Sequence, residues 1–238
     1  MDQQVLTEFR DGLWLSMDST RFLGLHMPTT MTVMRLESGG LLLYSPLAAT
    51  GERRAAVEAI GDVEHIYAPS LFHYLSVADW AQAYPDAKVH GPEGLPKKAE
   101  GLNLDRANNH GDPGFRGVSE IPIEGCRLGE TVLFHEASKT LICADLVHNI
   151  GRPDHTWTKV YSKLMGFYDD VALSRVLRWT AFSDKAAARA SVNRVLATGL
   201  EQLVVGHGTP VENAAANSLA TALQFLPGEA AAGLVNDG

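Results

Sequence analysis

The chain has 238 residues, of which 45% are hydrophobic and 20% are charged, a composition typical of a globular protein. This length fits one large core, so we expect a single domain over residues 1–238. The formal net charge of −8 argues against a phosphate-backbone partner, and the basic residues are scattered, so no nucleic-acid partner is expected. No apolar run is long enough to span a membrane, and no membrane partner is expected.

The chain start and the cysteines bear on location. The opening residues MDQQVLTEFRDG lack a basic region followed by an apolar core, so no secretory signal is predicted. Cys126 and Cys143 do not make a disulfide framework. Reduced thiols are typical of the cytoplasm, which is the location we expect. Nothing in the sequence indicates the oligomeric state.

The first part of the chain has the pattern of β structure with short helices. A turn signal, Ser38-Gly39-Gly40, separates two apolar runs and predicts a hairpin. The expected elements, in chain order, are strands at 12–17, 31–37 and 41–45, a helix at 52–60, a strand at 63–68, a helix at 76–84 and a strand at 87–91.

The second part of the chain is more helical. Residues 91–117 are rich in Gly, Pro and Asn and predict a long loop. Ser183 is the expected cap of one helix, and residues 209–212 (TPVE) fit a capping box that begins another. The remaining expected elements are strands at 118–123, 131–135 and 140–144, a helical insert at about 150–182, a helix at 184–198 and a strand at 203–206.

Three residues share one pattern, in which a short apolar strand ends and a metal-binding side chain follows it. They are His73 after VEHIYA, Asp145 after TLICA and His207 after LVVG. Strand ends hold side chains rigidly while the adjoining loops expose them. His and Asp are common ligands of zinc and iron. Each residue also has a plainer explanation, as a hydrogen-bonded histidine or a capping aspartate.

The order of these segments resembles the metallo-β-lactamase superfamily. GGLLLYSPLAATGERRAAVEAI looks like its opening unit, with Ser45-Pro46 where that family usually has Asp-Gly. PSLFHYLSVADW occupies the place of the family's His-x-His-x-Asp-His loop. LICAD looks like the strand that delivers the bridging aspartate, and VVGHG looks like the strand that delivers the last histidine.

More narrowly, the chain resembles a divergent, uncharacterised branch of that superfamily, a domain of unknown function with a degenerate metal-binding motif. The stretches that carry this resemblance are MTVMRLESGGLLLYSP, YPDAKVHGPEGLPKK, ETVLFHEASKTLICADL and VVGHG, and it covers roughly residues 10–225. It implies an α/β (α+β) fold, the four-layer αββα sandwich of metallo-β-lactamases.

The resemblance also implies a reduced set of metal ligands. Whichever of the loop's first two histidine positions His73 takes, the loop keeps no more than this one ligand. Cys126, in GCRLGETVLF, falls where the family's third histidine would be. A cysteine there can bind zinc as a thiolate or be a small buried residue. The candidate ligands are therefore His73, Cys126, Asp145 and His207.

Two further residues are candidates for supporting the ligands. His148 follows Asp145 by three positions and is either a partner of the ligands or a solvent-facing histidine. Glu130 either accepts a hydrogen bond from a ligand histidine, replaces a lost ligand or is an exposed charge at a strand end.

Two hypotheses follow. The first is a metal-dependent, hydrolase-like enzyme with at most one zinc or iron ion, acting on a small molecule. The second is a catalytically inactive, metal-free relative that binds a metabolite or a protein partner, with residues such as Leu75 and Val77 filling the metal position. Hydrolysis of β-lactams is not expected, because the loop lacks the ligands that it requires.

Overall fold

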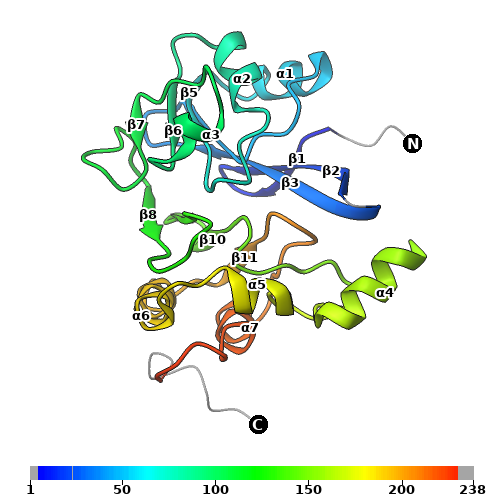
Figure 1. The fold of residues 1–238 in the computed structure, drawn as a ribbon. Coiled ribbons are helices and arrows are strands. Elements are labelled where there is room, and N and C mark those ends of the chain that lie inside the picture. The colour runs from blue at the N-terminus through cyan, green and yellow to red at the C-terminus, as the bar shows by residue number, and fades with distance from the viewer. Residues whose placement is uncertain (1–4, 23, 230–238) are drawn as a thin grey trace.

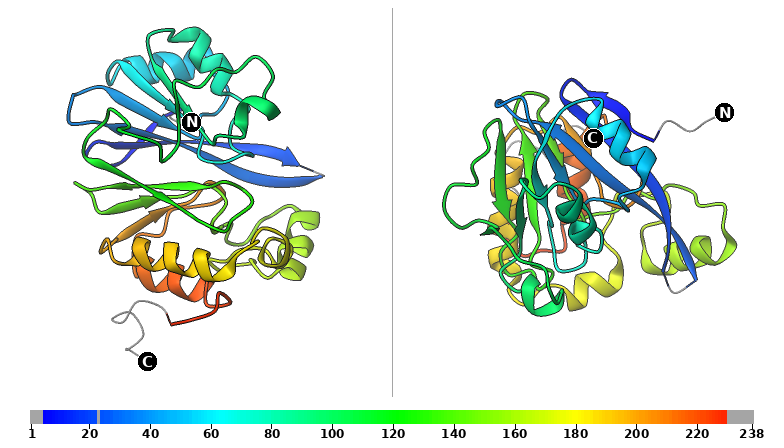
Figure 2. Two further views of the ribbon diagram at one scale, coloured as in Figure 1. Left: turned by 60° about the vertical axis from the view of Figure 1, so that its left-hand side comes forward. Right: turned by 90° about the horizontal axis from the view of Figure 1, so that it is seen from above.

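Two β-sheets pack face to face, and helices cover their outer faces, in a computed structural model that describes residues 5–22 and 24–229 (Figure 1). The four layers are clearest from the side, with one group of helices above the larger sheet and another below the smaller one (Figure 2). This arrangement is the αββα sandwich expected from the sequence.

The larger sheet has seven strands in the order of the chain. Neighbours are antiparallel from β1 to β4 and parallel from β4 to β7. The predicted hairpin is confirmed, with Thr32 opposite Tyr44. The strands are β1 (Thr7–Arg10), β2 (Leu13–Phe22), β3 (Leu25–Arg35), β4 (Leu41–Tyr44), β5 (Val63–Tyr67), β6 (Lys88–Gly91) and β7 (Arg106–Ala107).

The smaller sheet has four strands in the order β11-β10-β9-β8. Its strands are β8 (Val118–Pro122), β9 (Thr131–His135), β10 (Thr140–Ile142) and β11 (Gln202–Val204). β10 and β11 are parallel, whereas β8, β9 and β10 are antiparallel to their neighbours. All four strands lie within one or two residues of the expected ranges.

The helices fall into two groups and an outlying pair. α1 (Gly51–Glu58), α2 (Val77–Ala83) and α3 (Leu95–Lys98) lie over the larger sheet, and α6 (Lys185–Leu196) and α7 (Ala215–Ala222) lie over the smaller one (Figure 1). α4 (Thr156–Met165) and α5 (Arg175–Thr180) occupy the expected helical insert, and α4 projects to one side. Within the described ranges, no helix is long and apolar enough to cross a membrane.

The hydrophobic core has three parts. One cluster lies between the sheets and includes Tyr44, Tyr67 and Leu133. A second lies between the larger sheet and its helices, around Trp80, and a third lies between the smaller sheet and its helices, around Val192. The central strands of both sheets are thus buried on both faces, whereas the strand ends leave room for polar side chains to converge.

Three expectations for local structure need correction. Asp184, not Ser183, caps α6, by accepting hydrogen bonds from two backbone amides of its first turn. No helix begins at Thr209, because Val211 instead forms an antiparallel bridge with Leu203. The segment expected as a long loop, 91–117, contains α3 and the short strand β7.

Candidate metal centre

Four strand ends from both sheets meet at one edge of the sandwich. β4 and β5 are parallel, as are β10 and β11, so each pair delivers its following residues at the same end. Ser45 follows β4, His73 lies on the loop after β5, Asp145 follows β10, and His207 follows β11. The strand-end pattern in the sequence therefore does identify residues that converge in space.

Glycines on both sides of His207 allow this approach. A Cβ on Gly206 would lie 2.6 Å from the Ala144 carbonyl oxygen, and one on Gly208 would lie 1.9 Å from that of Asn149. Gly208 also has a φ of 119°, a conformation that other residues rarely adopt. The Gly-His-Gly sequence thus lets the end of β11 pack directly against the segment that carries Asp145.

His73, Asp145 and His207 form a compact triangle of potential ligand atoms. The two histidine Nε2 atoms are 3.2 Å apart, and Asp145 Oδ1 lies 3.3 Å from Nε2 of His73 and 3.4 Å from Nε2 of His207. A tetrahedral zinc site with bonds of about 2.0–2.1 Å places its ligand atoms about 3.3–3.4 Å apart. The three atoms therefore have the spacing of three corners of such a site.

The opposite ring nitrogens are held by the protein. His207 Nδ1 donates to the Pro28 carbonyl oxygen at 3.0 Å, and because a carbonyl only accepts, Nδ1 carries the hydrogen. His73 Nδ1 lies 2.8 Å from Ser45 Oγ. Partners of this kind fix the tautomer and ring orientation of metal-binding histidines. Sequence reasoning did not assign this role to Ser45, although it had noted Ser45 at the family's Asp-Gly position.

The triangle brings together atoms that need a cation or proton between them. A neutral His207 that donates through Nδ1 presents a lone pair at Nε2, and the Asp145 carboxylate only accepts. Burial would raise the pKa of Asp145, but the charges and hydrogen bonds of His73 and His207 hold it well below its usual range. Burial would lower the pKa of His207, but Asp145 raises it. The donor set of two imidazoles and one carboxylate fits zinc or non-haem iron.

Glu130 supports the backbone of the Asp145 segment and does not contact either histidine. It is buried, and its two carboxylate oxygens accept hydrogen bonds from the amides of Ala144 and Asp145, at 2.8 and 3.1 Å. Burial and the nearby charge of Asp145 raise its pKa to about 8. Of the alternatives for Glu130, the exposed strand-end charge is wrong.

His148 and Cys126 lie near the triangle but outside it. His148 is buried rather than solvent-facing, with its ring centroid 5.3 Å from that of His207, and burial lowers its pKa to about 3. Cys126 bridges to Phe182 through its backbone, and its Sγ is not among the converging ligand atoms of the described residues. Burial raises the pKa of its thiol to about 12, which disfavours the thiolate that zinc requires.

The apolar residues Leu75 and Val77, which are expected at ligand positions of the loop, do not occupy the triangle. Leu75 is 79% exposed, and Val77 is fully buried in the cluster beneath α2, on the outer face of the larger sheet. Ser70 Oγ shapes the intervening loop by accepting from the amides of Phe72 and His73. The loop therefore turns His73 toward Asp145 and His207 while its neighbours point elsewhere.

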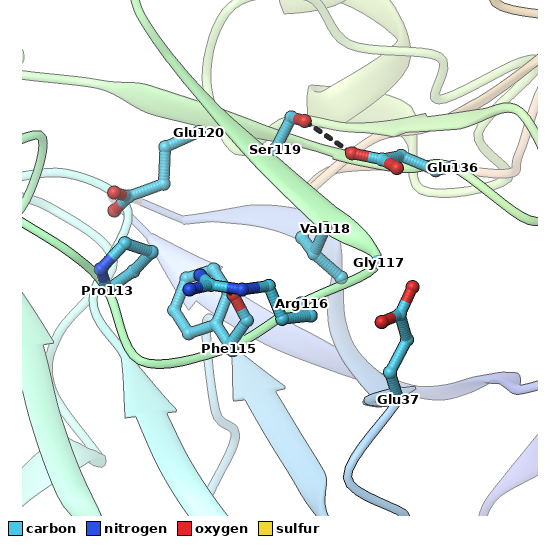
Figure 3. A pocket seen from close by; sticks show the side chains of 9 residues that line it. All are labelled: Glu37, Pro113, Phe115, Arg116, Gly117, Val118, Ser119, Glu120 and Glu136. Carbon is cyan, nitrogen blue, oxygen red and sulfur yellow. Dashed lines mark hydrogen bonds between the residues drawn. The ribbon is translucent and has the colours of Figure 1, made fainter.

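A second polar cluster, separate from the triangle, lies on β5, β6, β7 and β8. His65 Nδ1 and His90 Nε2 are 2.8 Å apart, and Arg106 donates to His90 Nδ1 and to Glu120. Tyr67 also donates to Glu120. An open pocket adjoins this cluster, and Figure 3 shows its lining side chains: Glu37, Pro113, Phe115, Arg116, Gly117, Val118, Ser119, Glu120 and Glu136.

Solved structures similar to this one are metallo-β-lactamases, which establishes the fold. A metallo-β-lactamase from Pontibacter korlensis matches with a TM-score of 0.64 and 14% identity, over 93% of this chain and 99% of that chain. The metallo-β-lactamase FIM-1 from Pseudomonas aeruginosa, solved in a mono-zinc form, matches with a TM-score of 0.62 and 11% identity, over 93% and 96% of the two chains.

Sequence comparisons are less informative. One family profile, described as a domain of unknown function (DUF4336), matches residues 10–95. A search of curated proteins finds no match. The matched segment runs from β2 to the start of α3, so it contains Ser45 and His73 but neither Asp145 nor His207.

Proposed function

We propose that this protein is a metal-dependent, hydrolase-like enzyme that acts on a small molecule and uses a single metal ion. The metallo-β-lactamase-like fold supports a hydrolytic scaffold. The observation that carries the proposal is the triangle of His73 Nε2, Asp145 Oδ1 and His207 Nε2, whose sides of 3.2–3.4 Å match a tetrahedral zinc site. Zinc or iron is the ion that this donor set favours.

The chain's own residues have distinct roles in this proposal. His73, Asp145 and His207 would hold the ion, leaving further coordination positions open to water and substrate. Ser45 and the Pro28 carbonyl orient the two imidazoles, and Glu130 holds the segment that carries Asp145. When bound, such an ion supplies Lewis acidity, which polarises a substrate oxygen and makes water a better nucleophile near neutral pH.

The alternative is a metal-free protein with the same fold. In that state a proton on His207 would replace the cation, and the raised pKa of His207 beside Asp145 is consistent with this. However, the alternative requires side chains such as Leu75 and Val77 to fill the metal position, and both lie elsewhere. The geometry therefore supports the metal-dependent function better.

Metal analysis of protein purified without a histidine tag tests the proposal. We expect about one zinc or iron ion per chain after loading, and its loss in His207→Ala. His110→Ala is the matched control, because His110 is an exposed histidine outside the triangle, and it should keep the ion. Wild-type protein with only trace metal after loading would contradict the proposal and favour the metal-free alternative.

A panel of hydrolase substrates then tests the reaction class. Esters, thioesters, lactones, phosphodiesters and a chromogenic β-lactam would be compared with metal-loaded wild type and His207→Ala. We expect turnover of a class other than β-lactams, because the loop that carries His73 lacks the other ligands expected for β-lactam hydrolysis. No turnover of any class by fully loaded wild type would contradict a hydrolytic role.

A further inference from the structure

Helix α4 is amphipathic, but it exposes its apolar face and buries its polar one. Thr158 and Ser162 are fully buried, whereas Trp157, Val160 and Leu164 are 49%, 44% and 57% exposed. The exposed residues are three and four positions apart, so they form one continuous stripe on the helix surface. We refer to Trp157, Val160 and Leu164 as the α4 stripe.

Polar contacts with the β2–β3 hairpin fix this orientation. The amide of His26 in β3 donates to Thr158 Oγ1 at 2.9 Å, and the rings of His26 and His155 stack with centroids 4.0 Å apart. Rotating α4 to bury the stripe would break both contacts. The outward position of the stripe is therefore built into the packing of α4 on the hairpin.

Cations flank the stripe on a protein that is otherwise acidic. Lys159 and Lys163 are exposed on α4, which contains no acidic residue, and Arg175 donates to the Leu164 carbonyl at 3.1 Å at the end of the helix. In the sequence that flanks the helix, the exposed acids are Asp154 before it and Asp169 and Asp170 after it, and Asp169 pairs with Arg152 at 2.7 Å. The helix is thus positively charged, whereas the chain as a whole has a net charge of −8.

We propose that α4 docks the protein onto an anionic lipid surface. A helix with tryptophan and aliphatic residues on one face and lysines beside them is the usual form of an interfacial membrane helix, since its apolar side chains enter the acyl boundary and its lysines contact anionic headgroups. This is peripheral docking and requires no spanning segment. It departs from the expectation of no membrane partner, because composition does not show which face of a helix is exposed.

A second copy of the chain fits the stripe less well. In a two-fold dimer the same patch meets itself, which would bring Lys159 and Lys163 of both copies together. The three half-exposed side chains present on the order of 300 Å², whereas a stable interface buries about 800 Å² on each partner. Charge and area both favour an anionic surface, and the inference is independent of the proposed metal-dependent function.

Vesicle sedimentation with the full chain tests this inference. Vesicles of phosphatidylcholine alone would be compared with vesicles that contain about 30% phosphatidylglycerol. We expect the wild type to sediment only with the anionic vesicles, and the bound fraction to fall as salt screens the lysines. Free phosphatidylglycerol headgroup, added as glycerol phosphate, should not compete, because it lacks the apolar phase that the stripe enters.

Variants separate the two contributions. Leu164→Gln should weaken vesicle binding about tenfold by removing apolar burial. Lys159→Gln with Lys163→Gln should weaken it by about 25-fold, from about fivefold for each lysine. Leu75→Gln and Lys97→Gln are matched controls, because both residues are exposed on other parts of the chain, and both should bind like the wild type.

Three outcomes would overturn the inference. One is wild-type protein that does not sediment with anionic vesicles. Another is binding that the stripe variants leave unchanged. A third is a wild-type dimer in light scattering that Leu164→Gln converts to a monomer, which would make the stripe a contact between copies. Circular dichroism of each variant establishes that a loss of binding is not a loss of folding.

Discussion

Two pairs of histidines bring their ring nitrogens together in this protein, and their surroundings differ. In the His65–His90 pair, Arg106 donates to His90 Nδ1, so His90 Nε2 carries a hydrogen and donates to His65 Nδ1. Every one of these contacts has one donor and one acceptor. In the His73–His207 pair, the outer nitrogens are held by Ser45 and Pro28, and the inner ones face each other and the Asp145 carboxylate.

The difference shows what distinguishes a candidate metal centre from a buried hydrogen-bond network. Both pairs are histidines on neighbouring strands or strand ends, so residue type alone does not separate them. The first pair is complete without a ligand, and burial lowers the pKa values of His65 and His90 to about 4 and 3, which keeps both rings neutral. The second pair converges on a point that needs positive charge.

Arg106→Ala should destabilise the fold without changing metal content. The Arg106–Glu120 pair is 2.6 Å apart with both side chains mostly buried, so removing the arginine leaves a buried carboxylate and an unpartnered His90 Nδ1. Breaking such a pair costs about 3–5 kcal/mol in the free energy of unfolding. Urea denaturation measures this cost. Loss of bound metal in the folded variant would show that the two histidine pairs are not independent.

Asp145→Asn should remove metal binding and leave the fold intact. The substitution keeps the shape of the side chain but removes the charge between His73 and His207. We expect zinc affinity to fall by more than about 100-fold, because losing a metal ligand should lower the affinity more than losing a residue that only hydrogen-bonds to a ligand. Zinc should then no longer raise the melting temperature. A variant that zinc stabilises as strongly as the wild type would exclude Asp145 as a ligand.

Ser45→Ala should weaken metal binding less than Asp145→Asn does. Ser45 contacts His73 Nδ1, and outer-shell partners of this kind contribute about 10–100-fold to metal affinity. Ser45→Asn is the matched rescue, because asparagine offers an acceptor oxygen and tolerates the φ of 52° found at this position. Competition with a chromophoric chelator measures both variants. Equal metal affinities for Ser45→Ala and the wild type would show that packing alone orients His73, without a contribution from Ser45.

The His65–His90 pair should make stability depend on pH. The folded pKa values of about 4 and 3 lie below the value of about 6.5 expected in the unfolded chain, so the unfolded state binds more protons once the pH falls below about 6.5. Stability should then decline on the order of 1 kcal/mol per pH unit for each histidine. Urea midpoints between pH 7.5 and 5 should decline less steeply in His65→Gln with His90→Gln. If the urea midpoints of the double variant and the wild type change equally with pH, His65 and His90 are not the source of the pH dependence.

The αββα fold is predicted from the resemblance to metallo-β-lactamases, whereas the three converging residues are predicted from the sequence pattern for a physical reason. Apolar runs mark buried strands, and a polar side chain directly after such a run lies at a sheet end, where other strand ends also lie. His73, Asp145 and His207 each have this pattern. The capping-box pattern at residues 209–212 predicts a helix there, which is wrong because the Leu203–Val211 bridge extends the sheet contact past the expected boundary.

Other features depend on tertiary contacts that the sequence does not show. The role of Ser45 requires the positive φ that directs its hydroxyl to His73. The His65–His90 pair lies within strands, and strand alternation places His65 and Tyr67 on one face. The hydrogen bonds that join this cluster to Glu120 come from Arg106 and Tyr67 and connect the two sheets, which alternation does not predict. The outward face of α4 depends on the hydrogen bond between His26 and Thr158.

The most direct test of the central claim is anomalous diffraction at the zinc edge from crystals grown with zinc. The account predicts a single anomalous peak about 2.0–2.2 Å from Nε2 of His73, Nε2 of His207 and a carboxylate oxygen of Asp145. Two peaks at this edge of the sheets, a peak on Cys126 Sγ, or no peak within reach of the three residues would contradict it.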